Sequence, residues 1–315
     1  MMATGHRPVM LEETLAALDP KDGEVVVDAT FGGGGHTGRI LERLGPDGKV
    51  VGIDRDPEAV DRASGLLWDR RFDFIGGAYD EVLWEMVGRG AQADAILFDL
   101  GLSSFQIDEP ERGFSYVREG PLDMRMDPRS GVSAADFLNT VEVGELARML
   151  FEGGATSRGE ARRVAQEVVR RRPLETTLDL TEAVRAAVGW ARRGGNPAKR
   201  IFQAVRIHVN DELGSLGRAL TGAVRLLVPG GRLVVITFHS GEDRLVKRFI
   251  SDRVGRCVCP PELPVCMCGA KPVLRRGVVR RPTAEEVREN PRSASARLRA
   301  AVRTAEPSGV GEDGP

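Results

Sequence analysis

Short apolar runs alternate with amphipathic segments over roughly the first hundred positions of the chain. Four runs rich in Val, Ile and Phe have the length of buried strands: 24–29, 49–53, 72–75 and 94–98. Between them, segments such as 37–44 and 56–70 show the apolar spacing of helices. This alternation predicts βαβ units, and therefore an α/β fold with a doubly wound, Rossmann-like sheet and right-handed crossovers.

The alternation stops after Asp99. The segment 101–130 is polar and rich in turn residues, and a connection of that length inside a compact domain is usually functional. Helical spacing then appears in five successive segments: 134–138, 143–151, 157–172, 178–190 and 196–207. A helix over 213–227 and a strand over 232–238 restore the earlier rhythm.

These patterns divide the chain into a sheet domain and a helical insertion. The predicted boundaries are 1–130 and 208–305 for a discontinuous sheet domain, 131–207 for an all-helical insertion and 306–315 for a disordered tail. No run approaches the ~18 apolar residues of a membrane span, and positions 1–10 lack the apolar core of a signal peptide. We therefore expect no membrane association and no export.

The 315 residues include four cysteines, all within one short segment. So few cysteines exclude a disulfide scaffold and predict a cytoplasmic location. Their arrangement, with one residue inside each of two pairs, permits a structural zinc knuckle, and free thiols in a surface hairpin are the alternative. The sequence leaves both interpretations open for Cys257, Cys259, Cys266 and Cys268.

The formal net charge of −1 conceals an uneven distribution. Residues 1–130 hold 14 Lys and Arg against 25 Asp and Glu, whereas residues 151–206 hold 12 against 6 and residues 271–305 hold 10 against 3. An acidic body with two basic stretches is typical of a protein that meets a polyanion through particular surfaces. The excess of Arg over Lys, 40 to 5, is also what a biased base composition would produce.

A glycine-rich loop follows the first predicted strand. It contains Gly33-x-Gly35-x-x-Gly38, which formally satisfies the dinucleotide fingerprint. The strand ends, however, in Asp28, a carboxylate poorly placed for a pyrophosphate but suited to a cationic ligand with an amino group and a sulfonium. Asp54, at the end of the second strand, is placed to accept both ribose hydroxyls of either cofactor. Together these carboxylates favour S-adenosylmethionine over a dinucleotide.

Two more strand ends carry candidate catalytic groups. Asp99 ends the fourth predicted strand, at the edge where ligands of doubly wound sheets bind. A carboxylate there can accept a hydrogen bond from the exocyclic amine of a base, whose conjugated lone pair is a poor nucleophile, and so favour the charge-developing transition state. His239 follows the strand 232–238 at the same edge, and a capped helix start is the alternative role of that loop.

Motifs along nearly the whole chain resemble those of the RsmH (MraW) family, the bacterial methyltransferases of small-subunit ribosomal RNA cytosine N4. They are HRPVM at 6–10, the glycine loop at 28–38, DLGLSS at 99–104, ERGFSY at 111–116, GPLDMRMD at 120–127, FQAVRIHVNDEL at 202–213, FHSGEDR at 238–244 and NPRSASARLR at 290–299. The resemblance implies a class I methyltransferase sheet, S-adenosylmethionine as cofactor and a helical insertion that recognises RNA. It also implies that the substrate is a cytosine in the decoding region of 16S rRNA, met within the small ribosomal subunit.

The resemblance further implies roles for individual residues. Carried over by position, the cofactor contacts are Gly34, Gly35, His36, Asp54, Tyr79, Asp99 and Gln106. Basic side chains become candidates for phosphate contacts that position RNA without reading its sequence. The candidates are Arg125, Arg200, Arg206, Arg292, Arg297 and Arg299. The 101–127 loop is placed to wrap a cytosine taken out of its stack, although Asp123, Arg125 and Asp127 could equally form a structural ion-pair cluster.

Two other functions are compatible with parts of the sequence. A non-catalytic RNA-binding ribosome-assembly factor on a methyltransferase fold would bind RNA without turnover. An NAD-dependent oxidoreductase would use the same glycine pattern, and a cofactor-binding titration separates it from a methyltransferase. The intact loop 33–35, Asp54 and Asp99 favour the enzyme over the assembly factor. We therefore expect an rRNA (cytosine-N4-)-methyltransferase with Asp99 as its leading catalytic group.

Overall fold

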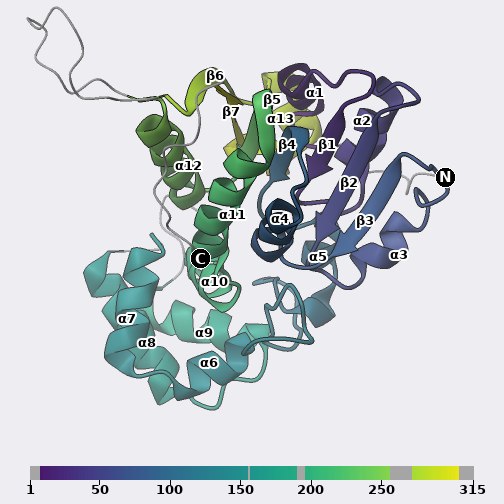
Figure 1. Cartoon of the computed structure of the whole chain (residues 1–315). Helices are drawn as coiled ribbons and strands as arrows, with labels where there is room; N and C mark the ends of the chain where they lie inside the picture. Colours follow the sequence, from purple (N-terminus) through teal and green to yellow (C-terminus); the bar gives the residue numbers. More distant parts are fainter. Residues whose placement is uncertain (1–7, 155–156, 190–195, 256–271, 305–315) are drawn as a thin grey trace, which may run out of the picture. The chain divides into compact units, whose positions relative to one another are not determined.

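The computed structural model describes residues 8–154, 157–189, 196–255 and 272–304 (Figure 1). The chain forms two compact units: a sheet unit that runs up to Gly101 and resumes at Gly214, and a helical unit, Leu102–Leu213. The four cysteines and the predicted tail at 306–315 lie outside the described residues. Within the described ranges, no helix is both long enough and apolar enough to cross a membrane.

The strands that the structure describes form one seven-stranded sheet. They are β1 (Val25–Asp28), β2 (Lys49–Asp54), β3 (Phe72–Gly76), β4 (Ala93–Asp99), β5 (Leu227–Thr237), β6 (Leu274–Arg280) and β7 (Arg297–Arg303), in the order β3-β2-β1-β4-β5-β7-β6. The first five strands are parallel, whereas β7 runs antiparallel to both β5 and β6. This is the predicted doubly wound, Rossmann-like sheet, extended at one edge by an antiparallel pair.

Helices cover both faces of the sheet. One face packs against α4 (Tyr79–Gly88), α11 (Glu212–Leu226) and α12 (Ser240–Arg253), and the other against α1 (Leu11–Leu18), α2 (Gly35–Arg43) and α3 (Ala59–Ala63). The central strand β4 shows why two layers are needed, because Ile96 and Phe98 enter the first core while Ala95 and Leu97 enter the second. All four side chains are fully buried, as expected of a parallel strand covered on both sides.

Part of the sheet unit differs from the sequence prediction. The helix expected over 56–70 is confined to α3, because Ser64 and Gly65, both weaker helix formers than Ala or Leu, follow it and the chain continues in turns. β6 and β7 were not predicted, and α13 (Ala284–Glu289) and the 3₁₀ helix η2 (Pro291–Ser295) connect them. Arg and Gly dominate β6, so it lacks the apolar run that marks a buried strand.

The helical unit has its own core. Its elements are α5 (Ser104–Asp108), the 3₁₀ helix η1 (Pro110–Arg112), α6 (Ala134–Thr140), α7 (Val143–Glu152), α8 (Arg158–Arg170), α9 (Thr177–Val188) and α10 (Pro197–Val209). Polar side chains cap five of these helices by accepting backbone N–H groups of the first turn: Ser103, Ser133, Ser157, Thr176 and Asn196. Of the five helices that the sequence predicts, the four that correspond to α6, α8, α9 and α10 have such a cap, which explains why they start close to the predicted positions.

The helical unit starts at Leu102, before the predicted boundary at 131. The reason is that the turn-rich segment supplies apolar side chains to the helical core, among them Phe114, Leu122 and Met124. Asn210 at the end of α10 fixes this segment: its Oδ1 accepts from the backbone N–H of Met126 at 2.8 Å, and its Nδ2 donates to the carbonyl of Met124 at 2.8 Å. Two motifs that the sequence singled out, 120–127 and 202–213, are therefore joined by direct hydrogen bonds.

Candidate active site at the carboxyl edge of the sheet

The candidate site lies where the strand order of the sheet reverses. β1 pairs with β2 on one side and with β4 on the other, so the crossovers leave β1 and β4 in opposite directions. In open α/β sheets, ligands bind beyond the carboxyl ends of the strands at such a point. Asp28 ends β1, Asp54 ends β2 and Asp99 ends β4. The sheet therefore brings three predicted carboxylates to one edge.

The glycine loop needs glycine at specific positions. Gly32 and Gly34 have φ angles of 57° and 73°, in the left-handed region that L side chains rarely adopt. A Cβ on Gly34 would lie 2.8 Å from the Phe31 ring, and a Cβ on Gly35 would lie 2.6 Å from Pro8. Gly34 is also the residue before the first turn of α2, where backbone N–H groups have no helical partner. The loop thus allows a ligand to approach the backbone closely.

Asp54 is held in place by the same loop. Its Oδ2 accepts from the backbone N–H of Gly32 at 2.7 Å, and its Oδ1 accepts from that of Asp56 at 2.9 Å. Each oxygen of the Asp54 carboxylate can accept a second hydrogen bond. The two oxygens together can therefore still accept from two hydroxyl groups. Burial raises the pKa of Asp54, although these two N–H groups oppose the shift.

Asp28 does not have the ligand-facing position that the sequence suggested. Its side chain is 1% exposed, its Oδ2 accepts from the Thr37 hydroxyl at 2.7 Å and its Oδ1 accepts from the backbone N–H of Thr30 at 3.2 Å. Burial raises the pKa of Asp28, and the nearby charge of His36 opposes the shift. Asp28 therefore holds the loop to the start of α2 from within the core.

His36 and Asp99 form the most unusual contact at this edge. His36, in the first turn of α2, is 6% exposed, and its Nε2 lies 3.4 Å from Oδ2 of Asp99. Among the described residues, neither ring nitrogen of His36 nor Oδ1 of Asp99 meets hydrogen-bond geometry with a partner. Buried polar atoms in this state are costly unless a ligand or water satisfies them. These atoms are therefore available to a polar ligand or to water.

The charges around His36 favour its cationic form. Burial alone would lower the pKa of His36, but the contact and charge of Asp99, with the further charge of Asp28, outweigh it and raise that pKa above its usual value. The backbone N–H of Asp99 donates to the Thr30 hydroxyl at 2.6 Å, which fixes the end of β4. The pair thus places the Asp99 carboxylate next to a buried imidazole whose pKa is raised.

The two remaining cofactor candidates belong to different units. Tyr79 begins α4, is half-buried and packs edge-on against Phe98, with ring centroids 5.7 Å apart and an interplanar angle of 88°. Gln106, in the helical unit, is buried and forms a capping box with Ser103, whose backbone N–H it accepts at 3.1 Å. The structure thus places Gly34, Gly35, His36, Asp54, Tyr79 and Asp99 in the sheet unit and Gln106 in the helical unit.

These residues fit a nucleoside that carries a positive charge. Asp54 offers acceptors for ribose hydroxyls, the glycine loop offers close backbone approach, and Asp99 has an unsatisfied carboxylate oxygen. The fit therefore favours S-adenosylmethionine, as predicted.

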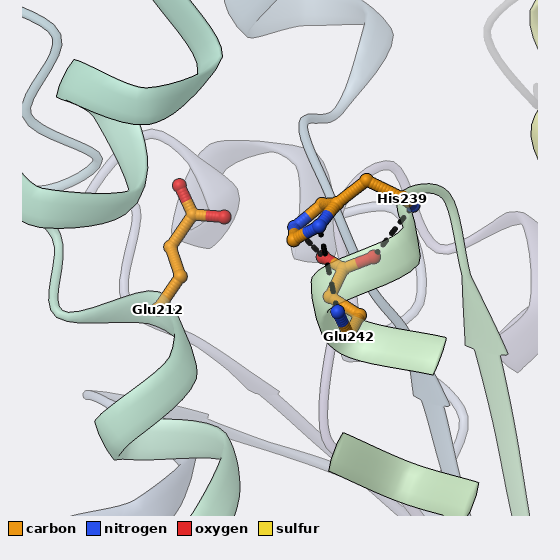
Figure 2. A group of neighbouring side chains, drawn as sticks. All are labelled: Glu212, His239 and Glu242. Carbon is orange, nitrogen blue, oxygen red and sulfur yellow. Dashed lines mark hydrogen bonds and ion pairs between the residues drawn. The ribbon is translucent and has the colours of Figure 1, made fainter. Parts of the chain in front are cut away.

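His239 is engaged as a helix cap in the structure (Figure 2). Its Nδ1 accepts from the backbone N–H groups of Gly241 at 3.2 Å and Glu242 at 3.4 Å, which leaves Nε2 as the ring nitrogen that can donate. That nitrogen faces Oε1 of Glu242 at 3.1 Å, while Oε2 accepts from the N–H groups of Phe238 and His239. Glu212, also drawn, belongs to the helical unit. The capped helix start that the sequence left open as the alternative is therefore present, with His239 as the capping residue.

Replacing His239 with alanine is expected to lower the free energy of unfolding by about 1 kcal/mol, because the first turn of α12 loses its cap. His239→Ser restores an ordinary Ser-x-x-Glu capping box with Glu242 and should recover most of that loss. Ser240→Ala is the matched control and should change stability little, since Ser240 is exposed. Urea unfolding of the three variants measures the difference, and equal losses for His239→Ala and Ser240→Ala would contradict the assignment.

The predicted RNA-contact arginines differ in their surroundings. Arg125 forms a bidentate pair with Asp123 at 2.7 and 2.8 Å, and Arg206 forms one with Glu212 at 2.6 and 2.8 Å. Arg200 is exposed on α10, and Arg292 is exposed on η2. Arg125 and Arg206 are therefore held by carboxylates of their own unit.

Arg297 and Arg299, also predicted to contact RNA, are engaged within the sheet unit. Arg297 Nη1 donates to Oδ2 of Asp243 at 2.7 Å, and Arg299 Nε donates to its Oδ1 at 2.7 Å. This cluster fastens α12 to β7, and sequence reasoning missed it. It also missed the hydroxyls of Thr30 and Thr37 as supports of the site. Only the three-dimensional pairing of distant segments brings these partners together.

Known proteins resemble this chain over nearly its whole length. The model of the MraW methylase family matches residues 3–304. A ribosomal RNA small subunit methyltransferase H of Rubrobacter xylanophilus is 72% identical over 308 residues, covering 98% of this chain and 99% of the relative. Its counterpart in Symbiobacterium thermophilum is 48% identical, and the match covers 96% of this chain and 98% of that relative. The structure of an rRNA methylase from Streptococcus thermophilus aligns with a TM-score of 0.43 and 12% identity over 96% of this chain and 99% of that one.

Proposed function

Since the chain belongs to the MraW methylase family, we propose that it methylates N4 of a cytosine in the decoding region of 16S ribosomal RNA, with S-adenosylmethionine as cofactor. The names of its relatives support small-subunit ribosomal RNA as the substrate. The sheet unit then acts as the methyltransferase domain, and the helical unit positions the RNA. The cytoplasm is where the enzyme would meet small ribosomal subunits.

One observation carries the proposal: the end of β4 presents Asp99, with an unsatisfied buried oxygen, next to His36 and the glycine loop. A methyl acceptor with an exocyclic N–H fits that carboxylate, because the amine can donate to it. A hydroxyl or carbon acceptor would fit less well, since it would require a stronger general base or a covalent nucleophile. No such nucleophile ends β1, β2 or β4 in the described structure.

The chain's own residues account for the other requirements. When bound, S-adenosylmethionine supplies an electrophilic methyl group on a sulfonium. Asp54 would accept hydrogen bonds from the ribose hydroxyls, and the ring of Tyr79 would pack against the adenine. Asp99 would accept an N–H of the cytosine amine, draw electron density toward its nitrogen and receive the proton shed as the new N–C bond forms. His36, whose Nε2 lies 3.4 Å from Oδ2 of Asp99, would help to orient that carboxylate.

Methyl transfer to small ribosomal subunits tests the proposal. Subunits purified from a strain that lacks the enzyme would be incubated with the protein and methyl-labelled S-adenosylmethionine, and the digested RNA would be separated into nucleosides. Label recovered as N4-methylcytosine from one position of 16S rRNA is the expected result. Cofactor binding without label in the RNA would instead favour a ribosome-assembly factor, and label in another nucleoside would refute the N4 assignment.

A further inference from the structure

Helix α12 carries a row of exposed cations on one face. Arg244, Lys247 and Arg248 are all exposed, and their spacing of three and four residues places them on the same side of the helix. Ser251 continues the row one turn later, and its hydroxyl accepts from Arg276 of β6 at 2.9 Å. We call the four basic side chains Arg244, Lys247, Arg248 and Arg276 the α12 ridge. The row on the helix, from Arg244 to Ser251, extends about 10 Å along the helix axis.

The ridge differs from other arginines of the sheet unit, many of which are paired with acids. Arg62 contacts Asp56, Arg71 contacts Asp69 and Arg232 contacts Glu24, at distances between 2.5 and 3.2 Å. By contrast, Arg244, Lys247, Arg248 and Arg276 have no carboxylate within ion-pair distance in the part of the chain that the structure describes. Their positive charge is therefore available to an external anion.

The acids near the start of α12 do not neutralise the ridge. Glu242 is 2% exposed and bound in the His239 cap, and Asp243 is shared by Arg297 and Arg299. Asp252 is the one exposed carboxylate on the described length of α12. The four basic side chains with Asp252 carry a net charge of +3 (four positive, one negative). A surface of this kind attracts a polyanion.

The position of the ridge links it to the site. α12 follows β5 directly, and β5 pairs with β4 so that Ile236 lies beside Asp99. The helix therefore begins at the same edge of the sheet as the candidate active site and leads away from it. β6, from which Arg276 comes, is the outermost strand, and six of its seven residues are exposed.

We propose that the α12 ridge, Arg244, Lys247 and Arg248 with Arg276 beyond them, binds the phosphate backbone of the RNA that enters the site. This inference rests on the proposed function and identifies a surface of the sheet unit that takes part in holding the substrate. Lys and Arg contacts to phosphates position a nucleic acid without reading its sequence, and each adds to the salt dependence of binding. The ridge adds three side chains of α12 and one of β6 to the arginines of the sheet unit that the sequence had named.

A charge-matched pair of triple variants tests this. The ridge variant is Arg244→Gln, Lys247→Gln, Arg248→Gln. The control is Lys21→Gln, Lys49→Gln, Arg89→Gln, which removes the same charge from exposed positions: Lys49 begins β2, and Lys21 and Arg89 precede β1 and β4. Fluorescence anisotropy with a labelled RNA hairpin of decoding-region sequence, at several salt concentrations, measures affinity. The ridge variant is expected to bind about 10- to 30-fold more weakly near 100 mM salt, with a log–log salt slope lower by about 2 to 3.

Conservative replacements and turnover separate the possible outcomes. Arg244→Lys with Arg248→Lys retains the charges and should bind nearly as the wild type does. In the methylation assay the ridge variant should raise the KM for the RNA substrate and leave the affinity for S-adenosylmethionine unchanged. Equal binding by the ridge and control variants would overturn the ridge assignment, even if methylation occurs. Wild-type protein that binds RNA through the ridge yet transfers no methyl group would refute the proposed function while leaving the ridge in place.

Discussion

Asp99→Asn is expected to lower the rate of methyl transfer by about 10²- to 10³-fold, the largest effect of any single substitution in the site. The amide keeps the size of the side chain, but it carries no negative charge to stabilise the developing positive charge on the amine and takes up its proton poorly. The N–H of Asp99 that donates to Thr30 is in the backbone, so the end of β4 should keep its position. Single-turnover methylation with saturating cofactor and small subunits measures the chemical step.

The matched control is Asp73→Asn, the same change at an exposed position of β3, where the carboxylate pairs with Lys49 at 2.6 Å. It should leave the single-turnover rate unaltered. Cofactor affinity of Asp99→Asn should fall less than tenfold, because other residues hold the ribose and adenine. A variant that loses cofactor binding and turnover in equal measure would show that Asp99 acts in binding and not in catalysis.

The main architecture could be predicted from the sequence because local pattern and buried environment agree. The strand predicted at 94–98 is β4, whose side chains are buried on both faces. The segments predicted at 143–151 and 157–172 correspond to α7 and α8. Amphipathic spacing marks both helices, and the Ser157 cap adds a second signal at the start of α8. Where the local pattern and the buried environment favour the same secondary structure, few other structures are open to the segment.

The remaining elements depend on distant partners. β6 contains four basic or glycine residues among seven, and its hydrogen bonds to β7 alone make it a strand. The segment 102–130 has little periodicity, and it joins the helical unit because Asn210, far along the chain, satisfies its backbone. Neither the β6–β7 pairing nor the Asn210 hydrogen bonds leave a pattern in the neighbouring residues. Analysis of short sequence segments therefore could not predict them.

The candidate site shows the same division. The strand-end position of Asp54 and Asp99 follows from the alternation of strands and helices. The glycine spacing marks the loop between β1 and α2. The burial of Asp28 and the capping of α12 by the His239 ring itself depend on packing, so the sequence left a cap at this position only as an alternative. A carboxylate at a strand end is equally compatible with a ligand contact and with a structural support until its neighbours are known.

Asp54→Ala is expected to weaken the binding of S-adenosylmethionine by about 100-fold. Hydrogen bonds to a charged acceptor contribute about 1.5 to 3 kcal/mol each, and the carboxylate has acceptor capacity for two ribose hydroxyls. The substitution also removes the acceptors of the Gly32 and Asp56 N–H groups, which hold the glycine loop. Asp54→Asn keeps one oxygen as an acceptor and should lose about tenfold. Isothermal titration gives both affinities, and Asp73→Ala is the control for loss of a carboxylate.

The pH dependence of that affinity distinguishes the ionised carboxylate from a merely structural residue. Burial raises the pKa of Asp54, so its proton binds at a higher pH than that of a solvent-exposed aspartate. As the pH falls through this raised pKa, the acceptor that the ribose requires becomes protonated and cofactor affinity should decrease. The Asn variant has no such group, so its affinity should lack this decrease over the same range. If wild type and Asp54→Asn showed the same pH profile, Asp54 would not be the group that binds the ribose.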